Sequence, residues 1–318
     1  MEKYRFVQMD VFTNTAFTGN PLAVFPDAQG LSDEHMMQIA REMNLSETVF
    51  VLPGSQDGPD DAQSQVLRHL RIFTPTREIP FAGHPVVGTW NALAREGVVP
   101  VPPDGNGWTR IHHEVGIGVL PVDIEFREAT PVKVVMTQGK FEVIDEINDA
   151  NDRAELARSL GRSVEDLDES LPIQVISTGL SCLAVPMRSL ENLRGCRVNS
   201  SQLAEIYTSK GGTGCHVFTR ETFEATSRAH ARFFAPADNI AEDPATGSAC
   251  GALGAYLVHH GVLKAASDET SVDFVIEQGD FMHRPSRVHL SVKGDTRQIE
   301  EVRVGGESVL VARGEVIF

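Results

Sequence analysis

Cysteine, cationic residues and long hydrophobic runs are scarce in this chain of 318 residues, and each scarcity excludes a class of protein. The four cysteines (Cys182, Cys196, Cys215 and Cys250) lie far apart and form no CxxC pair, so we expect reduced thiols rather than a disulfide framework or a metal site. No run approaches the roughly 18 apolar residues of a membrane-spanning helix, and the first residues carry no apolar signal segment. We therefore expect a cytoplasmic protein with no membrane contact.

Positive charge is in deficit, because 28 Lys and Arg residues stand against 44 Asp and Glu and give a formal net charge of −16. The cations are scattered rather than clustered. Such a chain repels polyanions, so we expect no binding to nucleic acid. A small anionic substrate remains compatible with this charge where a local site supplies positive potential.

Motifs of several enzyme classes are also absent. The chain has no Walker A sequence, and Ser248 lacks the GxSxG pattern of a nucleophile elbow. The run Gly211-Gly212-Thr213-Gly214 is not GxGxxG and precedes an expected strand, so it is interpreted as a turn. These absences disfavour a P-loop nucleotide site, a serine hydrolase and a dinucleotide site.

The chain does contain an internal repeat. Leu22-Ala23-Val24 returns as Leu183-Ala184-Val185, 161 residues later, and the segment 71–75 returns with the same offset as 232–236. A repeat at half the chain length predicts two like domains facing each other, and ligands tend to bind at such interfaces. We expect residues 1–120, completed by C-terminal strands at about 303–318, as the first domain and residues 121–302 as the second.

Each half contains one helix that should be central to its domain. The first is expected over 85–96, with Gly97 as its C-terminal cap, and the second over 248–260, with Gly261 as cap. The second helix is apolar nearly all round, which predicts burial on every side. Its interior glycines each cost about 1 kcal/mol of helix propensity and indicate close approach to other elements.

Strands are expected to surround these helices, together with two further capped helices. The expected strands are 5–12, 21–25, 48–52, 68–73, 173–177, 182–186, 216–219 and 229–234, with more along 302–318, and the further helices begin after Ser32 and at Asn199. The predicted fold is α+β, with a central helix sheathed by strands in each domain.

Small residues open both central helices, as Ala82-Gly83-His84 and as Ala245-Thr246-Gly247-Ser248. Backbone N–H groups and the helix dipole make a helix start a site for a carboxylate or phosphate. Two such starts meeting at an interdomain cleft would clamp a small carboxylic acid. Ordinary helix capping is the alternative at each start.

Titratable residues stand beside the helix starts. His84 could exchange a proton there, although a single histidine is often structural. Asp243 precedes a proline and Thr246, so it either reaches the same cleft or forms an Asp-Pro turn. Glu47 opens an apolar strand, where burial would raise its pKa and suit it to general-base catalysis; the alternative is a solvated strand end.

These segments together resemble the PhzF family of phenazine-biosynthesis isomerase-like proteins, which share the diaminopimelate-epimerase fold. The motifs that carry the resemblance are Asp10-Val11-Phe12, Phe17-Thr18-Gly19-Asn20-Pro21-Leu22-Ala23-Val24-Phe25, Asn44-Leu45-Ser46-Glu47-Thr48, Arg77-Glu78-Ile79-Pro80-Phe81-Ala82-Gly83-His84-Pro85, Glu242-Asp243-Pro244-Ala245-Thr246-Gly247-Ser248-Ala249 and Glu277-Gln278-Gly279. They are spread across nearly the whole chain. One position departs from the family pattern, because His283 stands where a glycine is common.

The resemblance implies two domains, each a barrel-like mixed sheet around a central helix, and an isomerase that needs no cofactor or metal. It implies that Glu47 is the acid/base and that His84, Asp243 and Ser248 complete the catalytic set. The residues expected to contact the substrate are Gly83, Thr246, Gly247, Asn20, Gln278 and Gly279. A dihydro-hydroxyanthranilate-like acid is the implied substrate type, and the sequence leaves open both its identity and whether the protein is a homodimer.

The related amino-acid racemases use one cysteine before each helix-opening glycine, whereas this chain has Ala82 and Thr246 there. Neither side chain forms a thiolate, so a two-thiol racemase is excluded. Two alternatives to the isomerase remain. A gapped alignment sets Cys215 opposite Glu47 in the repeat, which would suit a two-base epimerase, and a small-acid binding protein without turnover would keep the same fold.

Overall fold

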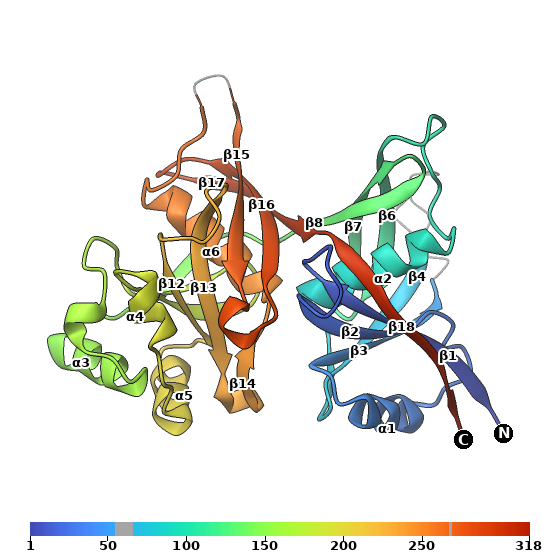
Figure 1. Ribbon diagram of the computed structural model, residues 1–318, viewed down its shortest axis with the longest axis horizontal. Coiled ribbons are helices and arrows are strands. Elements are labelled where there is room, and N and C mark those ends of the chain that lie inside the picture. The colour runs from blue at the N-terminus through green and yellow to red at the C-terminus, as the bar shows by residue number, and fades with distance from the viewer. Residues whose placement is uncertain (55–65, 267–268) are drawn as a thin grey trace. The chain divides into compact units, whose positions relative to one another are not determined.

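The computed structural model describes residues 1–54, 66–266 and 269–318, and the chain forms two units (Figure 1). Unit 1 comprises Met1–Met136 and Gly305–Phe318, and unit 2 comprises Thr137–Val304. The chain leaves unit 1 at the end of β8 (Thr130–Thr137) and returns within β17 (Ile299–Gly306). The expected domain boundary at residue 120 falls inside β7 (Gly118–Arg127), which pairs with both β6 and β8, so residues 121–136 stay with unit 1.

Unit 1 contains a mixed sheet and two helices. Its further elements are β1 (Lys3–Val11), β2 (Asn20–Phe25), α1 (Asp33–Met43), β3 (Glu47–Pro53), β4 (Val66–Phe73), β5 (Glu78–Ile79), α2 (Gly83–Arg95), β6 (Gly107–Val115) and β18 (Ser308–Ile317). The strands follow the order β18-β1-β2-β3-β4-β6-β7-β8, and among the described residues of this order the β2–β3 and β4–β6 pairs are parallel and the others antiparallel. The C-terminal strand thus joins the N-terminal strand.

Unit 2 repeats this topology. Its elements before β17 are β9 (Glu142–Glu146), α3 (Ala150–Ser159), η1 (Val164–Asp166), β10 (Gln174–Ser177), β11 (Ser181–Pro186), α4 (Leu190–Arg194), α5 (Ser200–Ser209), β12 (Cys215–Thr219), β13 (Ser227–Ala235), η2 (Pro236–Asp238), β14 (Ile240–Asp243), α6 (Gly247–His259), β15 (Ser271–Gln278), η3 (Asp280–Met282) and β16 (Ser286–Gly294). Within the described part of this unit, the order is β9-β10-β11-β12-β13-β15-β16, in which β11–β12 and β13–β15 are parallel and the other pairs antiparallel. Each pair matches its counterpart in unit 1.

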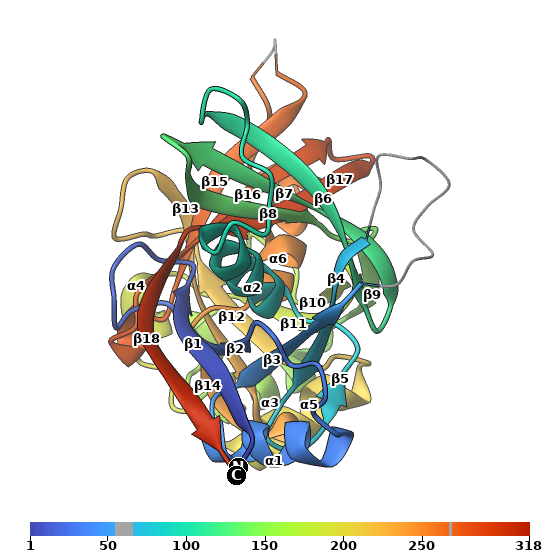
Figure 2. The same cartoon turned by 90° about the vertical axis from the view of Figure 1, so that its right-hand side faces the viewer.

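One helix lies inside the sheet of each unit. Every residue of α2 from Gly83 to Ala94 is buried, and Figure 2 shows this helix surrounded by the strands of unit 1. Helix α6 is buried along most of its length and packs against β10, β11 and β16. The α+β class and the sheet around a central helix are therefore confirmed. Within the described ranges, the helices are too short or too polar to span a bilayer.

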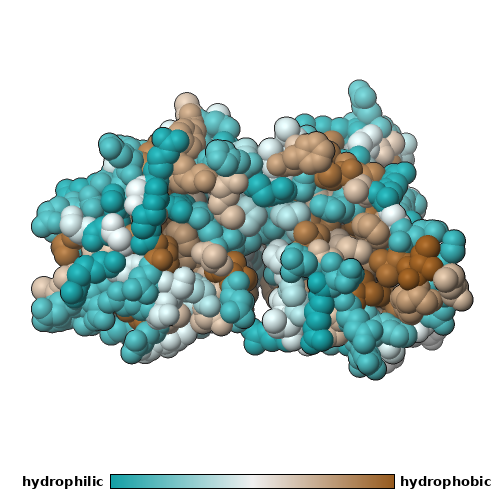
Figure 3. Space-filling model, turned by 60° about the horizontal axis from the view of Figure 1, so that its bottom comes forward, coloured by the Kyte–Doolittle hydropathy of each residue, from teal (hydrophilic) through white to brown (hydrophobic). Residues whose placement is uncertain are grey.

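The second face of each sheet is covered by the outer helices. In unit 1, Phe25, Phe50 and Phe73 pack with the buried face of α1. In unit 2, the corresponding apolar cluster combines residues of β11 and β12 with α3 and α5. On the face shown in Figure 3, hydrophobic side chains form separate patches among hydrophilic ones. Each sheet therefore packs apolar side chains on both faces, against the central helix on one and against the outer helices on the other.

The repeat in the sequence aligns Leu22 of β2 with Leu183 of β11. In the structure, this alignment is shifted by one residue. Leu22 faces α2, where a Cβ on Gly88 would meet its side chain at 2.7 Å, whereas Leu183 packs in the cluster with α3 and α5. In β2, Phe25 points toward the outer helix α1, as Leu183 points toward the outer helices of unit 2. The counterpart of Leu183 in β2 is therefore on the same face as Phe25, an even number of residues from it. Because successive strand residues point to opposite faces, the structural equivalent of Leu183 is Ala23.

This shift moves Cys215 away from the position predicted for it. Ala23 pairs with Thr48, and Leu183 pairs with Cys215, so Cys215 corresponds to Thr48. The pairing with the next strand agrees, because Thr48 lies opposite Phe73 and Cys215 lies opposite Phe234, its counterpart in the repeat. Glu47 therefore corresponds to Gly214, and the predicted equivalence of Glu47 and Cys215 is wrong.

Candidate active site

Glu47 is the first residue of β3 and lies just after α1, whose C-cap residue Asn44 has a left-handed conformation (φ 50°). Its side chain is 13% exposed, and its Oε2 atom lies 3.4 Å from His84 Nε2. That oxygen accepts no hydrogen bond from any described residue. Burial raises the pKa of Glu47 to about 7, against the lowering effect of a hydrogen bond from Ser46. A carboxyl group with this pKa can exchange a proton near neutrality.

His84 lies in the first turn of α2, and the loop before β2 brings Asn20 to it. Asn20 Nδ2 lies 3.4 Å from His84 Nδ1, and Ser46 Oγ donates to Asn20 Oδ1 at 3.4 Å. With the Asn20 amide donating to Nδ1, the proton of a neutral imidazole is on Nε2, which faces Glu47. The structure thus brings Asn20, Glu47 and His84 together in unit 1, with Ser46 as a fourth member.

The start of α2 has no side-chain cap. Its N-cap residue is Ala82, and its first turn contains no acidic residue. An alanine cannot accept hydrogen bonds from the first-turn N–H groups as Ser or Asp would. Gly83 and His84 therefore stand at a helix start whose electrostatics suit an anion.

A second set of predicted residues meets in unit 2. Asp243 ends β14, Thr246 is the N-cap residue of α6, and Gly247 and Ser248 form the first turn. The Thr246 hydroxyl does not cap the helix but donates to Asp243 Oδ2 at 2.5 Å. Asp243 is 8% exposed. The carboxylate and the helix start are therefore joined directly.

Gln278, like Asn20, has no exposed surface. Its amide nitrogen donates to Asp243 O at 2.7 Å and to Thr246 Oγ1 at 3.1 Å. Its amide oxygen accepts from Thr246 N at 3.3 Å and from the Cys250 thiol at 3.5 Å. Gln278 was expected to contact the substrate, but both its amide nitrogen and its amide oxygen form hydrogen bonds within unit 2.

Between β15 and β16, the backbone conformation restricts which residue fits at two positions, Gly279 and His283. Gly279 has φ 83°, and a Cβ there would lie 2.5 Å from Pro244 O and still closer to Arg284 O. His283 also has a left-handed backbone, with φ 59° and ψ 27°. A left-handed residue favours glycine, which explains why glycine suits the position that His283 occupies.

The residue before Gln278 is held on the opposite face of β15. Glu277 Oε2 lies 2.8 Å from His230 Nδ1, and its carboxylate accepts the backbone N–H groups of Phe223 and Glu224. Burial favours a raised pKa for Glu277, but these hydrogen bonds outweigh it and lower the pKa to about 2. The sequence does not predict this contact, because His230 and Glu277 are distant in the chain.

Cys215 cannot take part in a two-base reaction with Glu47. It is fully buried in the apolar cluster of unit 2, and burial raises the pKa of its thiol well above the usual value. A reactive cysteine requires an accessible thiolate. The two-base alternative is therefore contradicted, because Cys215 lies on the sheet face opposite the central helix.

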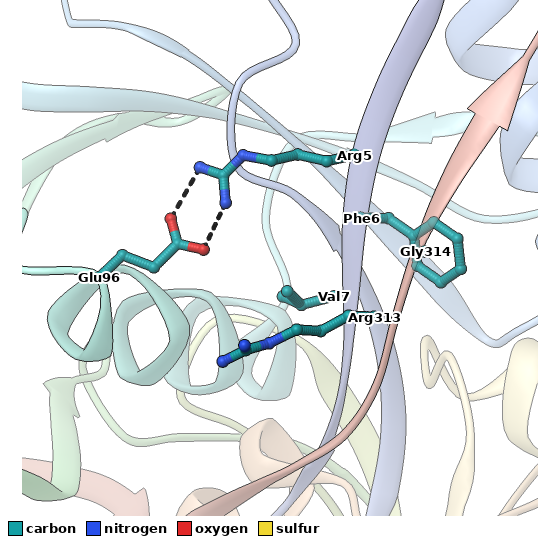
Figure 4. Close-up of a pocket in the computed structure, with 6 residues that line it drawn as sticks. All are labelled: Arg5, Phe6, Val7, Glu96, Arg313 and Gly314. Atoms are coloured by element: carbon teal, nitrogen blue, oxygen red, sulfur yellow. Dashed lines mark hydrogen bonds and ion pairs between the residues drawn. The ribbon is translucent and has the colours of Figure 1, made fainter.

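A surface pocket of about 490 Å³ lies on unit 1 and contains none of the predicted residues. It is lined by Arg5, Phe6, Val7, Glu96, Arg313 and Gly314. Figure 4 shows the Arg5 and Arg313 side chains extending to the side of Glu96, and Arg5 forms a bidentate pair with Glu96 at 2.6 and 2.8 Å. That pair raises the pKa of Arg5 further. Because the one carboxylate that lines it is paired with Arg5 and none of the predicted residues reaches it, this pocket is a poor candidate for the reaction site.

Comparison with known proteins identifies the family. The family model for phenazine biosynthesis-like proteins, PhzC-PhzF, matches residues 9–314. An uncharacterized isomerase of Clostridium acetobutylicum is 36% identical over 100% of this chain and 99% of its own, and the trans-2,3-dihydro-3-hydroxyanthranilate isomerase of Pseudomonas fluorescens is 32% identical over 99% and 100%.

The fold comparison agrees. The crystal structure of a PhzF-family phenazine biosynthesis protein of Bacillus anthracis matches 100% of both chains with a TM-score of 0.84 and 29% identity. The match therefore extends over both units rather than over one motif. The chain belongs to the PhzC-PhzF family of phenazine biosynthesis-like proteins, and it is an isomerase.

Proposed function

We propose that this protein is a cofactor-independent isomerase that moves a proton along a conjugated small carboxylic acid, with Glu47 as the general base. The observation that carries the proposal is the largely buried Glu47 carboxyl, whose pKa is raised to about 7 and whose Oε2 faces His84 Nε2 at 3.4 Å. A base with such a pKa is ionised often enough at neutral pH to accept a proton and acidic enough to return it.

In the proposed reaction, the Glu47 carboxylate takes a proton from an acidic C–H next to a conjugated system. The C–H electron pair is delocalised into that system, and the protonated Glu47 returns the proton at another carbon. One C–H bond breaks, another forms and a double bond moves, so no oxidant or reductant is consumed. His84 donates a hydrogen bond from Nε2 to the charge that Glu47 or the substrate carries.

Asp243 and Ser248 complete the proposed catalytic set, and the starts of α2 and α6 bind the substrate carboxylate. We place this substrate in a cleft between the two domains, as the repeat in the sequence predicts. Support comes from the uncapped starts of both central helices. A dihydro-hydroxyanthranilate is the first candidate substrate, because a relative 32% identical to this chain is named for it.

Proton exchange tests the proposal. The protein is incubated in D₂O with trans-2,3-dihydro-3-hydroxyanthranilate and with a panel of conjugated and 2-substituted carboxylic acids, and deuterium incorporation is followed by NMR. We expect incorporation by the wild type and a loss of about 10²-fold or more in Glu47→Gln. Glu47→Asp, which retains the carboxylate but withdraws it by one methylene, should lose less than Glu47→Gln. Full exchange by Glu47→Gln would remove Glu47 as the base.

Ligand binding separates the roles of the two units. Ser248→Ala should weaken the binding of an exchanging acid more than Glu47→Gln does, because Ser248 holds the bound acid whereas Glu47 serves proton transfer. Isothermal titration calorimetry measures both affinities. Acids that stabilise the protein against heat without any deuterium incorporation would instead indicate a binding protein without turnover.

A further inference from the structure

The orientation of the Gln278 amide is fixed by two backbone groups. Its Nε2 lies 2.7 Å from the Asp243 carbonyl oxygen, and its Oε1 lies 3.3 Å from the Thr246 backbone nitrogen. A carbonyl oxygen only accepts a hydrogen bond, and a backbone N–H only donates one. The amide therefore has a single orientation that satisfies both partners, unlike a side-chain amide surrounded by groups of either type.

This orientation determines where the Thr246 hydroxyl proton points. The second proton of Gln278 Nε2 is donated to Thr246 Oγ1 at 3.1 Å, so that oxygen is an acceptor. Its own proton is then donated to Asp243 Oδ2 at 2.5 Å. The three side chains form a directional chain of donors, from Gln278 through Thr246 to Asp243, and both ends of this chain are buried.

We propose that Gln278 and Thr246 are positioning residues that commit Asp243 Oδ2 to accepting a hydrogen bond and so hold the Asp243 carboxylate in one orientation. Rotation of the carboxylate would break the bond between Asp243 Oδ2 and the Thr246 hydroxyl. This inference rests on the proposed function for the reaction that Asp243 serves.

The position of Gln278 is itself fixed from three sides. Glu277 is anchored by His230 on the opposite face of β15, and Gly279 leaves no room for a side chain beside Pro244 O. The Cys250 thiol, on α6, donates to Gln278 Oε1. Each residue of the Glu277-Gln278-Gly279 motif therefore contributes to holding one amide group against Asp243 and Thr246.

Steady-state kinetics with a turned-over acid test the chain of donors. Gln278→Met keeps the length of the side chain, and Thr246→Val keeps its shape, but each removes a link. We expect each to lower kcat about 10- to 100-fold with a smaller change in KM, the double variant to lose no more than the worse single variant, and Thr246→Ser to retain most activity. Additive losses would overturn the inference.

Gln174→Met is the matched control. Gln174 is also a buried glutamine of unit 2, but its amide bonds go to Glu146 and to His260, beyond the last residue of α6. Its replacement removes the same kind of hydrogen bonds and tests general damage to the unit. If Gln278→Met lowers kcat no more than Gln174→Met does, Gln278 has no positioning role.

Solution NMR gives a readout that does not depend on turnover. In Gln278→Met, the Thr246 amide should exchange with solvent faster, and the Asp243 carboxyl carbon resonance should shift as it does in Thr246→Val; neither change is expected in Gln174→Met. Unchanged signals would overturn the hydrogen-bond chain even in an active enzyme. If the wild type turns over none of the acids, the proposed function fails, while these signals still decide whether Gln278 and Thr246 fix Asp243.

Discussion

The carboxyl group of Glu47 is held in a protein environment that disfavours its charge. Burial raises its pKa to about 7 from a usual value of 4.5. Its Oε2 atom lies 3.4 Å from Nε2 of His84. The same environment that suits the group to proton transfer therefore lowers the stability of the fold wherever the group is ionised.

Replacing Glu47 with glutamine should stabilise the protein in a pH-dependent way. Because the pKa is raised in the folded state, Glu47 costs no stability below about pH 4.5, where it is protonated in both states, and the cost grows until the pH exceeds 7. Each pKa unit corresponds to about 1.4 kcal/mol, so Glu47→Gln should gain up to about 3 kcal/mol above pH 7. Urea unfolding at pH 5 and pH 8.5 measures this; an equal gain at both would contradict it.

The left-handed backbone of His283 gives a second prediction for a single residue. A residue with a Cβ loses about 1–2 kcal/mol in this conformation, whereas glycine does not. Because glycine also has more freedom in the unfolded chain, His283→Gly should exceed His283→Ala in stability by about 1 kcal/mol. Thermal and urea unfolding of the two variants check this, and a more stable alanine variant would show that the turn relaxes in solution.

At the scale of elements, helix α6 contains glycines where neighbouring side chains approach its backbone closely, although glycine has a low helix propensity. A Cβ at Gly251 would overlap Gln138 Oε1 and lie 2.8 Å from a methyl group of Val304. Gln138 in turn donates to Gly247 O at 3.1 Å and accepts from Thr178. The absence of a side chain at Gly251 thus leaves room for Gln138, just after β8, to donate a hydrogen bond to the first turn of α6.

Gly251→Ala should therefore destabilise the protein, although alanine gains about 1 kcal/mol over glycine in an open helix. Overpacking of this kind costs about 1–3 kcal/mol. Urea unfolding of Gly251→Ala, of Gln138→Ala and of the double variant measures the effect. The double variant should recover part of the loss, since the obstructing side chain is gone; a stabilised single variant would contradict the close contact.

At the scale of the whole molecule, the two units share a topology but not their chemistry. The sheet position that holds Glu47 in unit 1 holds Gly214 in unit 2. The helix-start position of His84 corresponds to Ser248, and Asp243 and Thr246 add a hydroxyl–carboxylate pair that unit 1 lacks at Ala82. The repeat therefore supplies two similar frames, and the proposed proton transfer depends on residues that differ between them.

The C-terminal strand belongs to unit 1, which predicts a selective effect of its removal. β18 pairs with β1 from Lys3 to Val11, and Phe318 stacks on Tyr4 with ring centroids 5.9 Å apart. Deletion of residues 308–318 should accelerate amide exchange in β1 and β2 while β12 and β13 keep their protection. Hydrogen exchange with mass spectrometry resolves the two regions, and an equal loss in both units would contradict the assignment.

The sequence by itself determined the local elements and the family. Both central helices were predicted within about two residues of their observed ends, because Pro85, Gly97 and Gly261 are local signals that act on the backbone wherever the chain goes. The apolar pattern of α6 likewise implied burial on every side. Strands between 107 and 146 and between 271 and 294 were not predicted, although β6 alternates buried and half-buried residues along its second half.

Only the tertiary structure decided which residues meet. The face on which Cys215 lies depends on a one-residue register between strands, which short identities in a repeat do not resolve. The burial that raises the pKa of Glu47 brings it beside His84, 37 residues away in the sequence, and the amide of Gln278 is held by β14 and the start of α6. Desolvation and hydrogen-bond direction are properties of surroundings that distant segments create, so the sequence named these residues but their roles follow from the fold.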